Sequence, residues 1–134
     1  MTTAAELIRY RLSRAAESLQ EAEELLHAGH ANTFVNRLYY ACFYAVLALS
    51  IPKDFASSKH SGVRAFFHKE YVKTGIFEVR LGSLYDRLFD TRQKADYVDL
   101  VCFDTTEVAP WLVEAKEFVE CVNALIAKEK YLED

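Results

Sequence analysis

The stretch NTFVNRLYYACFYAVLALS, residues 32–50, decides the fold of this 134-residue chain. Its apolar side chains recur every three or four residues, at Val35, Leu38, Cys42 and Val46, which is the period of an α-helix. The aromatic residues between them widen the apolar face until the helix is apolar nearly all round. Such a helix is normally buried, so we expect residues 32–50 to form the central helix of a bundle.

The segments on either side repeat the helical period. Residues 3–28 carry an apolar stripe with steps of three and four, and Gly29 follows where helices commonly end. A third helix is expected to start at a cap on Ser57 or Ser58, because serine side chains accept hydrogen bonds from free backbone N–H groups. Gly75 is expected to end it.

The second half of the chain adds two further helices and a connection. The apolar side chains of residues 81–92 have helical spacing, and residues 95–103 are predicted to form an extended, packed loop. Asp104 opens a capping-box pattern, but Pro110 would then lie inside the helix, where its missing N–H costs a hydrogen bond. We therefore expect the last helix to begin near Thr106. Together the segments predict an all-α, antiparallel up-and-down bundle of about five helices.

Length and composition indicate a single domain over residues 1–134. Apolar residues make up 51% and charged residues 27% of the chain, which is typical of a soluble globular protein. The net charge of −4 excludes strong electrostatic attraction to nucleic acid over the whole surface, so any such contact needs a local basic patch. The cysteines, Cys42, Cys102 and Cys121, form no CxxC pair and predict neither a disulfide framework nor a zinc knuckle.

The sequence also gives expectations about location and cofactors. The N-terminus lacks the layout of a signal peptide, and the longest apolar run, residues 39–51, is too short to cross a bilayer. We therefore expect a cytoplasmic protein with no membrane partner. The four histidines lack metal-ligand spacing, and no glycine-rich phosphate loop is present. No metal and no cofactor are expected.

Polar residues within the central helix form the first candidate for a functional site. Asn36, Tyr40 and Tyr44 are spaced by four residues and therefore lie in one line on the helix surface. Two interpretations remain open. The tyrosines are core residues with their hydroxyl groups at the edge, or the row is a polar line facing a cleft.

Two further polar groups border helices. Lys59 and His60 precede the third helix, where free N–H groups and the positive end of the helix dipole suit a phosphate; an exposed capping turn is the alternative. Arg92, Asp96 and Tyr97 stand where the fourth helix runs out. An arginine there complements the helix dipole, and one held by a nearby acid also presents a fixed fork to a phosphate.

Three motifs together resemble a known family. NRLYYACFYA at residues 36–45, KHSGV at 59–63 and RQKADY at 92–97 are similar, in order and spacing, to the signatures of HEPN-domain proteins. The closest likeness is to the small stand-alone prokaryotic branch, toxin-like proteins paired with minimal nucleotidyltransferases. The resemblance covers nearly the whole chain. It implies an up-and-down bundle, a homodimer, and a nucleotidyltransferase partner in a toxin–antitoxin pair.

The resemblance also implies a reaction. Many members are metal-independent ribonucleases that use an arginine followed, after four to six residues, by a histidine, with the motifs of two protomers meeting at the dimer interface. Arg92 matches the arginine, but Tyr97 stands in place of the histidine. A tyrosine has an ordinary pKa of about 10 and is a poor base at neutral pH. His60 could supply the base if the fold brings it near Arg92.

Three functions follow as hypotheses. The first is a homodimeric module that binds nucleotide or RNA phosphate in a cleft made by Arg92, Asp96 and Tyr97, with Lys59 and Tyr40 also in the binding set beside Asn36 and His60. The second is a metal-independent ribonuclease toxin whose catalytic residues are Arg92, His60 and Tyr97. The third is a non-catalytic module that binds a protein partner. The resemblance further implies that Tyr97 could accept AMP groups from a nucleotidyltransferase, which requires an exposed hydroxyl.

Overall fold

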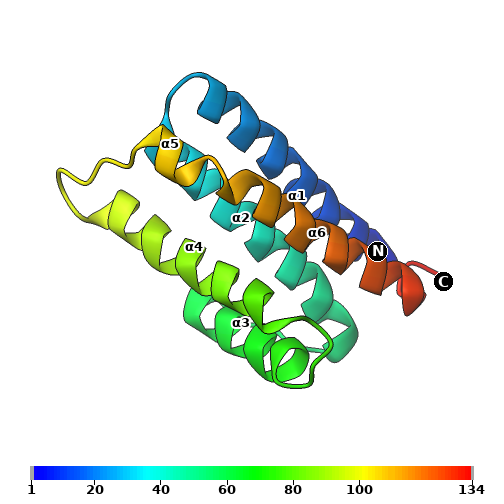
Figure 1. Cartoon of the computed structure of the whole chain (residues 1–134). Helices are drawn as coiled ribbons and strands as arrows, with labels where there is room; N and C mark the ends of the chain where they lie inside the picture. The colour runs from blue at the N-terminus through cyan, green and yellow to red at the C-terminus, as the bar shows by residue number, and fades with distance from the viewer. Residues whose placement is uncertain (1, 134) are drawn as a thin grey trace.

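A computed structural model describes residues 2–133 as helices joined by turns, with no strand in that range (Figure 1). The elements are α1 Ala4–His27, α2 Ala31–Ser50, α3 His60–Phe67, α4 Val79–Tyr97, α5 Thr105–Val108 and α6 Trp111–Lys128, with a 3-10 turn η1 at Ile51–Lys53 and a π-helical turn η2 at His68–Val72. The predicted all-α bundle is confirmed. α1, α2 and α6 lie side by side, and α3 and α4 pack along the other side of α2 (Figure 1).

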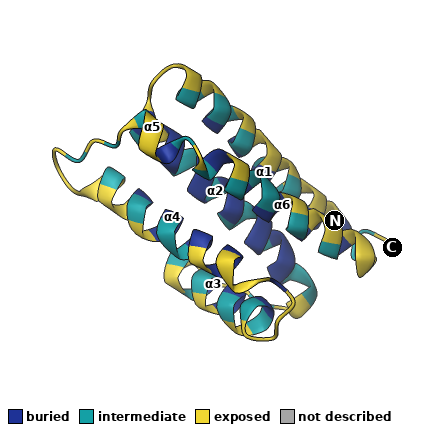
Figure 2. Ribbon diagram, viewed as in Figure 1, coloured by how far each residue is buried: buried dark blue, intermediate teal, exposed yellow. Residues whose placement is uncertain are grey.

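The α2 helix is the centre of the bundle, as its apolar sequence predicts. It packs against α1, α3, α4 and α6, and most of its residues are buried (Figure 2). The core continues between α3, α4 and α6 as a group of aromatic rings. The Phe118 ring lies 5.2 Å from that of Phe67 and 6.0 Å from that of Tyr85, within the range of favourable aromatic contact. These contacts fix α4, which carries the candidate site, against the rest of the fold.

The same helix, with the turn after it, also has the length of a membrane span. Ala31–Lys53 is the one segment in residues 2–133 whose length and hydropathy would allow it to cross a bilayer. Its helical part, α2, begins at Ala31 and so starts before the apolar run of residues 39–51. Most of the segment is covered by the other helices, which is the environment of a core helix in a bundle.

The start of α3 differs from the prediction. Its N-cap residue is Lys59, and neither Ser57 nor Ser58 caps the helix. The Ser57 hydroxyl instead accepts a hydrogen bond from the Lys59 N–H at 3.1 Å, just before the helix. This position is open to Ser57 because Gly62 has no Cβ, which would lie 2.5 Å from the serine Oγ. No side chain within residues 2–133 caps the first turn of α3, so the N–H groups of His60 and Ser61 remain available, whereas that of Gly62 donates to the Lys59 carbonyl.

The connection after α4 is less packed than predicted. α4 continues to Tyr97, because no glycine or proline interrupts it after Arg92. Leu100 is fully exposed and has φ 66°, a left-handed conformation that leucine rarely adopts. Asn32 holds the rest of the loop: its side chain donates to the Val101 carbonyl and accepts from the backbone N–H of residue 103. The prediction of an extended, packed loop over residues 95–103 is therefore wrong for residues 95–97, which are helical, and for residues 98–100, which are exposed.

The last helix is divided in two, which a single start near Thr106 did not foresee. Asp104 caps α5 after all, accepting from the Thr106 N–H at 2.8 Å. Pro110 then serves as the N-cap residue of α6, where a missing N–H costs nothing. The cap at Asp104 and the proline at position 110 are therefore compatible, because Asp104 begins α5 and Pro110 begins α6.

Candidate functional site

Arg92 is the one buried charged residue in the described part of the chain, with 4% of its side chain exposed. Its guanidinium carbon lies 4.4 Å from the centre of the Tyr39 ring, a cation–π contact with α2. Its Nε atom is buried and has no hydrogen-bond partner within residues 2–133. Asp96, one helical turn further along α4, lies 3.6 Å from Nη1. This separation is too long for a hydrogen bond, so the buried cation is incompletely paired.

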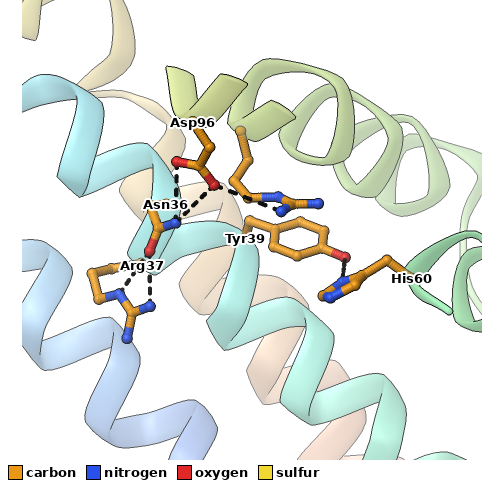
Figure 3. Close-up of polar contacts among 6 residues, drawn as sticks. Asn36, Arg37, Tyr39, His60 and Asp96 are labelled. Carbon is orange, nitrogen blue, oxygen red and sulfur yellow. Dashed lines mark hydrogen bonds and ion pairs between the residues drawn. The ribbon is translucent and has the colours of Figure 1, made fainter. Parts of the chain in front are cut away.

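His60 contacts the hydroxyl group of the same tyrosine. The Tyr39 hydroxyl and His60 Nδ1 are 2.6 Å apart and share a hydrogen bond (Figure 3). The imidazole also stacks on Phe43, with ring centres 4.4 Å apart and planes 24° apart. Tyr39 is fully buried and therefore fixes both partners. The fold thus brings His60, at the start of α3, and Arg92, near the end of α4, to one tyrosine of α2.

Asn36, on α2, links Asp96 of α4 to its neighbour Arg37. Its Nδ2 donates to the Asp96 carboxylate at 3.3 Å, and its Oδ1 accepts from two nitrogens of Arg37 at 2.8 and 3.1 Å (Figure 3). The Asn36 amide thus donates to the Asp96 carboxylate and accepts from the Arg37 guanidinium, so it bridges a negative and a positive side chain. We name Asn36, Tyr39, His60, Arg92 and Asp96 the Arg92 cluster.

Tyr97 lies outside this cluster. It is 75% exposed and faces a surface depression lined by Asp90, Gln93, Lys94, Tyr97 and Val98, all from the last part of α4 and the residue after it. Five residues along a helix rotate a side chain by about 140°, whereas the four residues from Arg92 to Asp96 rotate it by about 40°. The expected single cleft of Arg92, Asp96 and Tyr97 therefore differs from the structure, which separates the tyrosine.

The other predicted residues lie at the edge of the cluster. Tyr40 is half-buried, and its ring centre is 5.9 Å from that of His60 and from the guanidinium carbon of Arg92. Lys59 is exposed, and its side chain forms no ion pair within residues 2–133. Tyr39 is the residue that sequence reasoning missed, because it was counted with the apolar side chains. Tyr39 lies three residues after Asn36, so it is next to the line of Asn36, Tyr40 and Tyr44 on the helix surface. This spacing is the signal that could have identified it.

Comparison with known proteins identifies the family. A family model described as the HEPN domain matches residues 8–127, nearly the whole chain. The chain belongs to the HEPN domain family. It is 42% identical over 120 residues to a "UPF0332 protein" from Thermotoga maritima, covering 90% of this chain and 91% of that protein. It is also 33% identical over 119 residues to "Putative toxin MJ0605" from Methanocaldococcus jannaschii, covering 88% and 87% of the two chains.

A second protein of Methanocaldococcus jannaschii, "Putative toxin MJ0142", is 37% identical over 86 residues, covering 64% of this chain and 58% of that protein. The HEPN resemblance stated from the three motifs is thereby confirmed. No group of three or more histidine, cysteine, aspartate or glutamate side chains in the described range of this HEPN chain is placed to hold a metal ion.

Burial sets the protonation of His60 and Tyr39, which meet in the Arg92 cluster. The pKa of His60 is lowered, first because burial disfavours the imidazolium and second because of the positive charge of Arg92. Burial raises the pKa of Tyr39 to about 12, so its hydroxyl keeps its proton at neutral pH. A neutral His60 with Nδ1 bonded to Tyr39 leaves Nε2 as its free ring nitrogen.

Acid is expected to destabilise the fold through His60. Below the ordinary histidine pKa of about 6.5, the unfolded chain takes up a proton that the folded chain, with its lower His60 pKa, does not. The unfolded state then binds more protons, so stability falls as pH falls through this window and is constant above it. Melting temperatures should be measured at pH values about one unit above and below 6.5. We expect the melting temperature to fall more at the lower pH for the wild type than for His60→Gln. The exposed His30→Gln is the control and should behave as the wild type.

Proposed function

We propose that this HEPN protein acts as a homodimer and binds the phosphate groups of a nucleotide or an RNA at the Arg92 cluster. The supporting observation is the incomplete pairing of Arg92, which is 4% exposed, has Asp96 only at 3.6 Å and leaves Nε without a partner in the described range. Burying such a poorly paired charge costs stability, and the interaction of the cation with the end of the helix dipole returns only part of that cost. A phosphate group supplies the oxygen acceptors that this guanidinium lacks.

The surroundings of Arg92 fit the same ligand. His60 has Nε2 free, and α3 begins at this residue with uncapped N–H groups and the positive end of its dipole. Tyr39 holds the arginine and the histidine in a fixed relation, so little side-chain entropy is lost on binding. Because the chain as a whole carries a charge of −4, attraction of a phosphate depends on local cations such as Arg92.

The direct test is binding of a short fluorescent RNA in EDTA by the wild type and by Arg92→Gln. We expect the variant to bind at least tenfold more weakly, because a charged hydrogen bond to phosphate is lost. Lys94→Gln is the control: it removes a cation from the same helix, exposed and outside the cluster. If the wild type and Arg92→Gln bind RNA with equal affinity, or if neither binds, phosphate binding at this residue is contradicted and a protein-interaction module is favoured.

A second function, metal-independent RNA cleavage, is favoured by the contact of His60 and Arg92 with one tyrosine. In this reaction the Nδ1–H of His60 donates to the Tyr39 hydroxyl oxygen, so Nε2 can take the proton of a ribose 2′-hydroxyl. The 2′-oxygen attacks the neighbouring phosphorus to form a 2′,3′-cyclic phosphate, and the 5′-oxygen leaves and takes a proton from water. Arg92 holds the phosphate charge in the transition state. The lowered pKa of His60 keeps the base unprotonated at neutral pH.

Incubation of RNA with the protein in EDTA separates cleavage from binding. Cleavage in the wild type that falls by roughly 100-fold or more in His60→Gln, with RNA affinity nearly unchanged, is the expected result for a proton-transfer residue. His30→Gln should cleave as the wild type does. Intact RNA in every sample would leave binding as the function of the cluster.

The dimer and the nucleotidyltransferase partner are part of the same proposal. Exposed apolar side chains beside the site, Val98 and Leu100, supply a surface that a second copy covers. Tyr97 is exposed enough to serve as the AMP acceptor. Its hydroxyl oxygen attacks the α-phosphorus of ATP and gives up its proton to solvent, while the α–β phosphoanhydride bond breaks and pyrophosphate leaves. Light scattering tests the dimer, and labelling from radioactive ATP by a co-purified nucleotidyltransferase, lost in Tyr97→Phe, tests the modification.

A further inference from the structure

A row of two tyrosines with an arginine at each end crosses the surface between α1 and α2. The guanidinium carbon of Arg37 lies 5.1 Å from the centre of the Tyr40 ring, the rings of Tyr40 and Tyr44 are 6.2 Å apart, and the guanidinium carbon of Arg14 lies 5.3 Å from the Tyr44 ring. All four side chains are only half-buried. We name these four residues the stacking strip.

The stacking strip is continuous with the Arg92 cluster. Tyr40 lies 5.9 Å from both the His60 ring and the guanidinium of Arg92. Phe43 joins the other tyrosine to the cluster, since its ring is 6.0 Å from that of Tyr44 and stacks on that of His60. Planar groups therefore lead away from the proposed phosphate site along α2.

The two arginines of the strip keep most of their charge available. Each has one carboxylate contact at 3.5 Å, Arg14 with Glu17 and Arg37 with Glu21. By comparison, Arg80 makes two hydrogen bonds to the carboxylate of Glu117. Single long ion pairs at the surface are weak in water, and the Asn36 amide that accepts from Arg37 is neutral. Both guanidinium groups therefore keep a positive charge that attracts an anion.

We propose that the stacking strip binds the unpaired bases of single-stranded RNA while the Arg92 cluster binds a phosphate of the same strand. The inference rests on the proposed function and specifies its substrate. Aromatic rings and arginine planes take up unstacked bases without selecting their sequence. Two tyrosines one helical turn apart, beside a separate phosphate site, fit a strand of at least two nucleotides. Duplex RNA cannot use the strip, because its bases are stacked inside the helix.

Tyr44 gives the cleanest test, because it belongs to the strip but contacts neither His60 nor Arg92. Tyr44→Ala and Tyr44→Leu remove the flat ring, and each should weaken single-stranded RNA binding about 5- to 100-fold. Tyr44→Phe keeps the ring and should bind within about twofold of the wild type. Arg14→Gln should reduce affinity and lower the dependence on salt concentration by about one charge.

Controls separate the strip from the phosphate site. Trp111→Leu removes the ring of another half-buried arginine–aromatic pair, Arg87 with Trp111, and should leave RNA affinity unchanged. Binding of duplex RNA by the wild type should be weaker and unaffected by Tyr44→Leu. Melting curves establish that each variant is folded.

Each other outcome overturns the inference in a distinguishable way. If Tyr44→Leu and Arg14→Gln bind single-stranded RNA as the wild type does while Arg92→Gln does not, the phosphate site stands and the strip has no role in binding. If Tyr44→Leu converts a dimer into monomers, the strip is an interface between copies. If the wild type binds no RNA, the proposed function fails together with this inference.

Discussion

Arg92→Met is expected to abolish RNA binding while leaving the fold about as stable as the wild type, or more stable. Arg92 is 4% exposed, and the buried cation is poorly paired, so an apolar side chain of similar length removes a desolvation cost. The lost contact with Tyr39 offsets about 0.5–2 kcal/mol of this gain. We expect a free energy of unfolding within about 1 kcal/mol of the wild type, or higher, in urea titrations.

The comparison with Arg87→Met makes this result specific. Arg87 is half-buried and pairs with Glu114 at 2.7 Å, so its loss should change neither RNA affinity nor stability by much. A fall of several kcal/mol in Arg92→Met would mean that the arginine is a structural residue of the helix end. With the expected result, the buried charge of Arg92 would lower the stability of the fold while being required for RNA binding, which is the expected compromise between stability and function.

Phe118→Ala is expected to lower the free energy of unfolding by about 3–5 kcal/mol. The Phe118 ring is fully buried among the rings of Phe67, Phe77 and Tyr85, so truncation leaves a cavity where α3, α4 and α6 meet. Chemical denaturation with a constant slope would show the loss as a shift of the midpoint.

Val113→Ala provides the matched control on the same helix. Val113 is 70% exposed, so its truncation should change stability by no more than about 0.5 kcal/mol. Similar effects of the two substitutions would contradict the packing of α6 against α3 and α4. Because Tyr85 also packs beside Tyr39, at 6.0 Å between ring centres, Phe118→Ala should weaken RNA binding as well.

The sequence was sufficient for the central helix and for the pairing of Arg92 with Asp96. Apolar period and helical spacing are local properties, so α2 and the i,i+4 pair on α4 can be predicted without a structure. The division of α5 from α6 was also present in the sequence, as a cap at Asp104 and a proline at Pro110. It was missed because one helix was assumed where two satisfy both signals.

The meeting of His60 and Arg92 could not be predicted in the same way. The two residues lie on different helices, and their contact through Tyr39 depends on how α3 and α4 pack against α2. Tyr39 is buried, and a buried tyrosine in an apolar helix has the same sequence pattern as any core residue. The exposure of Tyr97 follows from the extra length of α4, which no stop signal limits.

The most direct measurement is the NMR signal of the Arg92 Nε–H group during titration with RNA. The signal can be assigned by its absence in Arg92→Met, and the buried, unpartnered Nε makes it a specific reporter. Phosphate binding at the Arg92 cluster predicts that the signal shifts saturably with a short single-stranded RNA and stays in place with nucleosides that carry no phosphate. A signal that stays unmoved while RNA saturates the protein, or that nucleosides move equally, would contradict it.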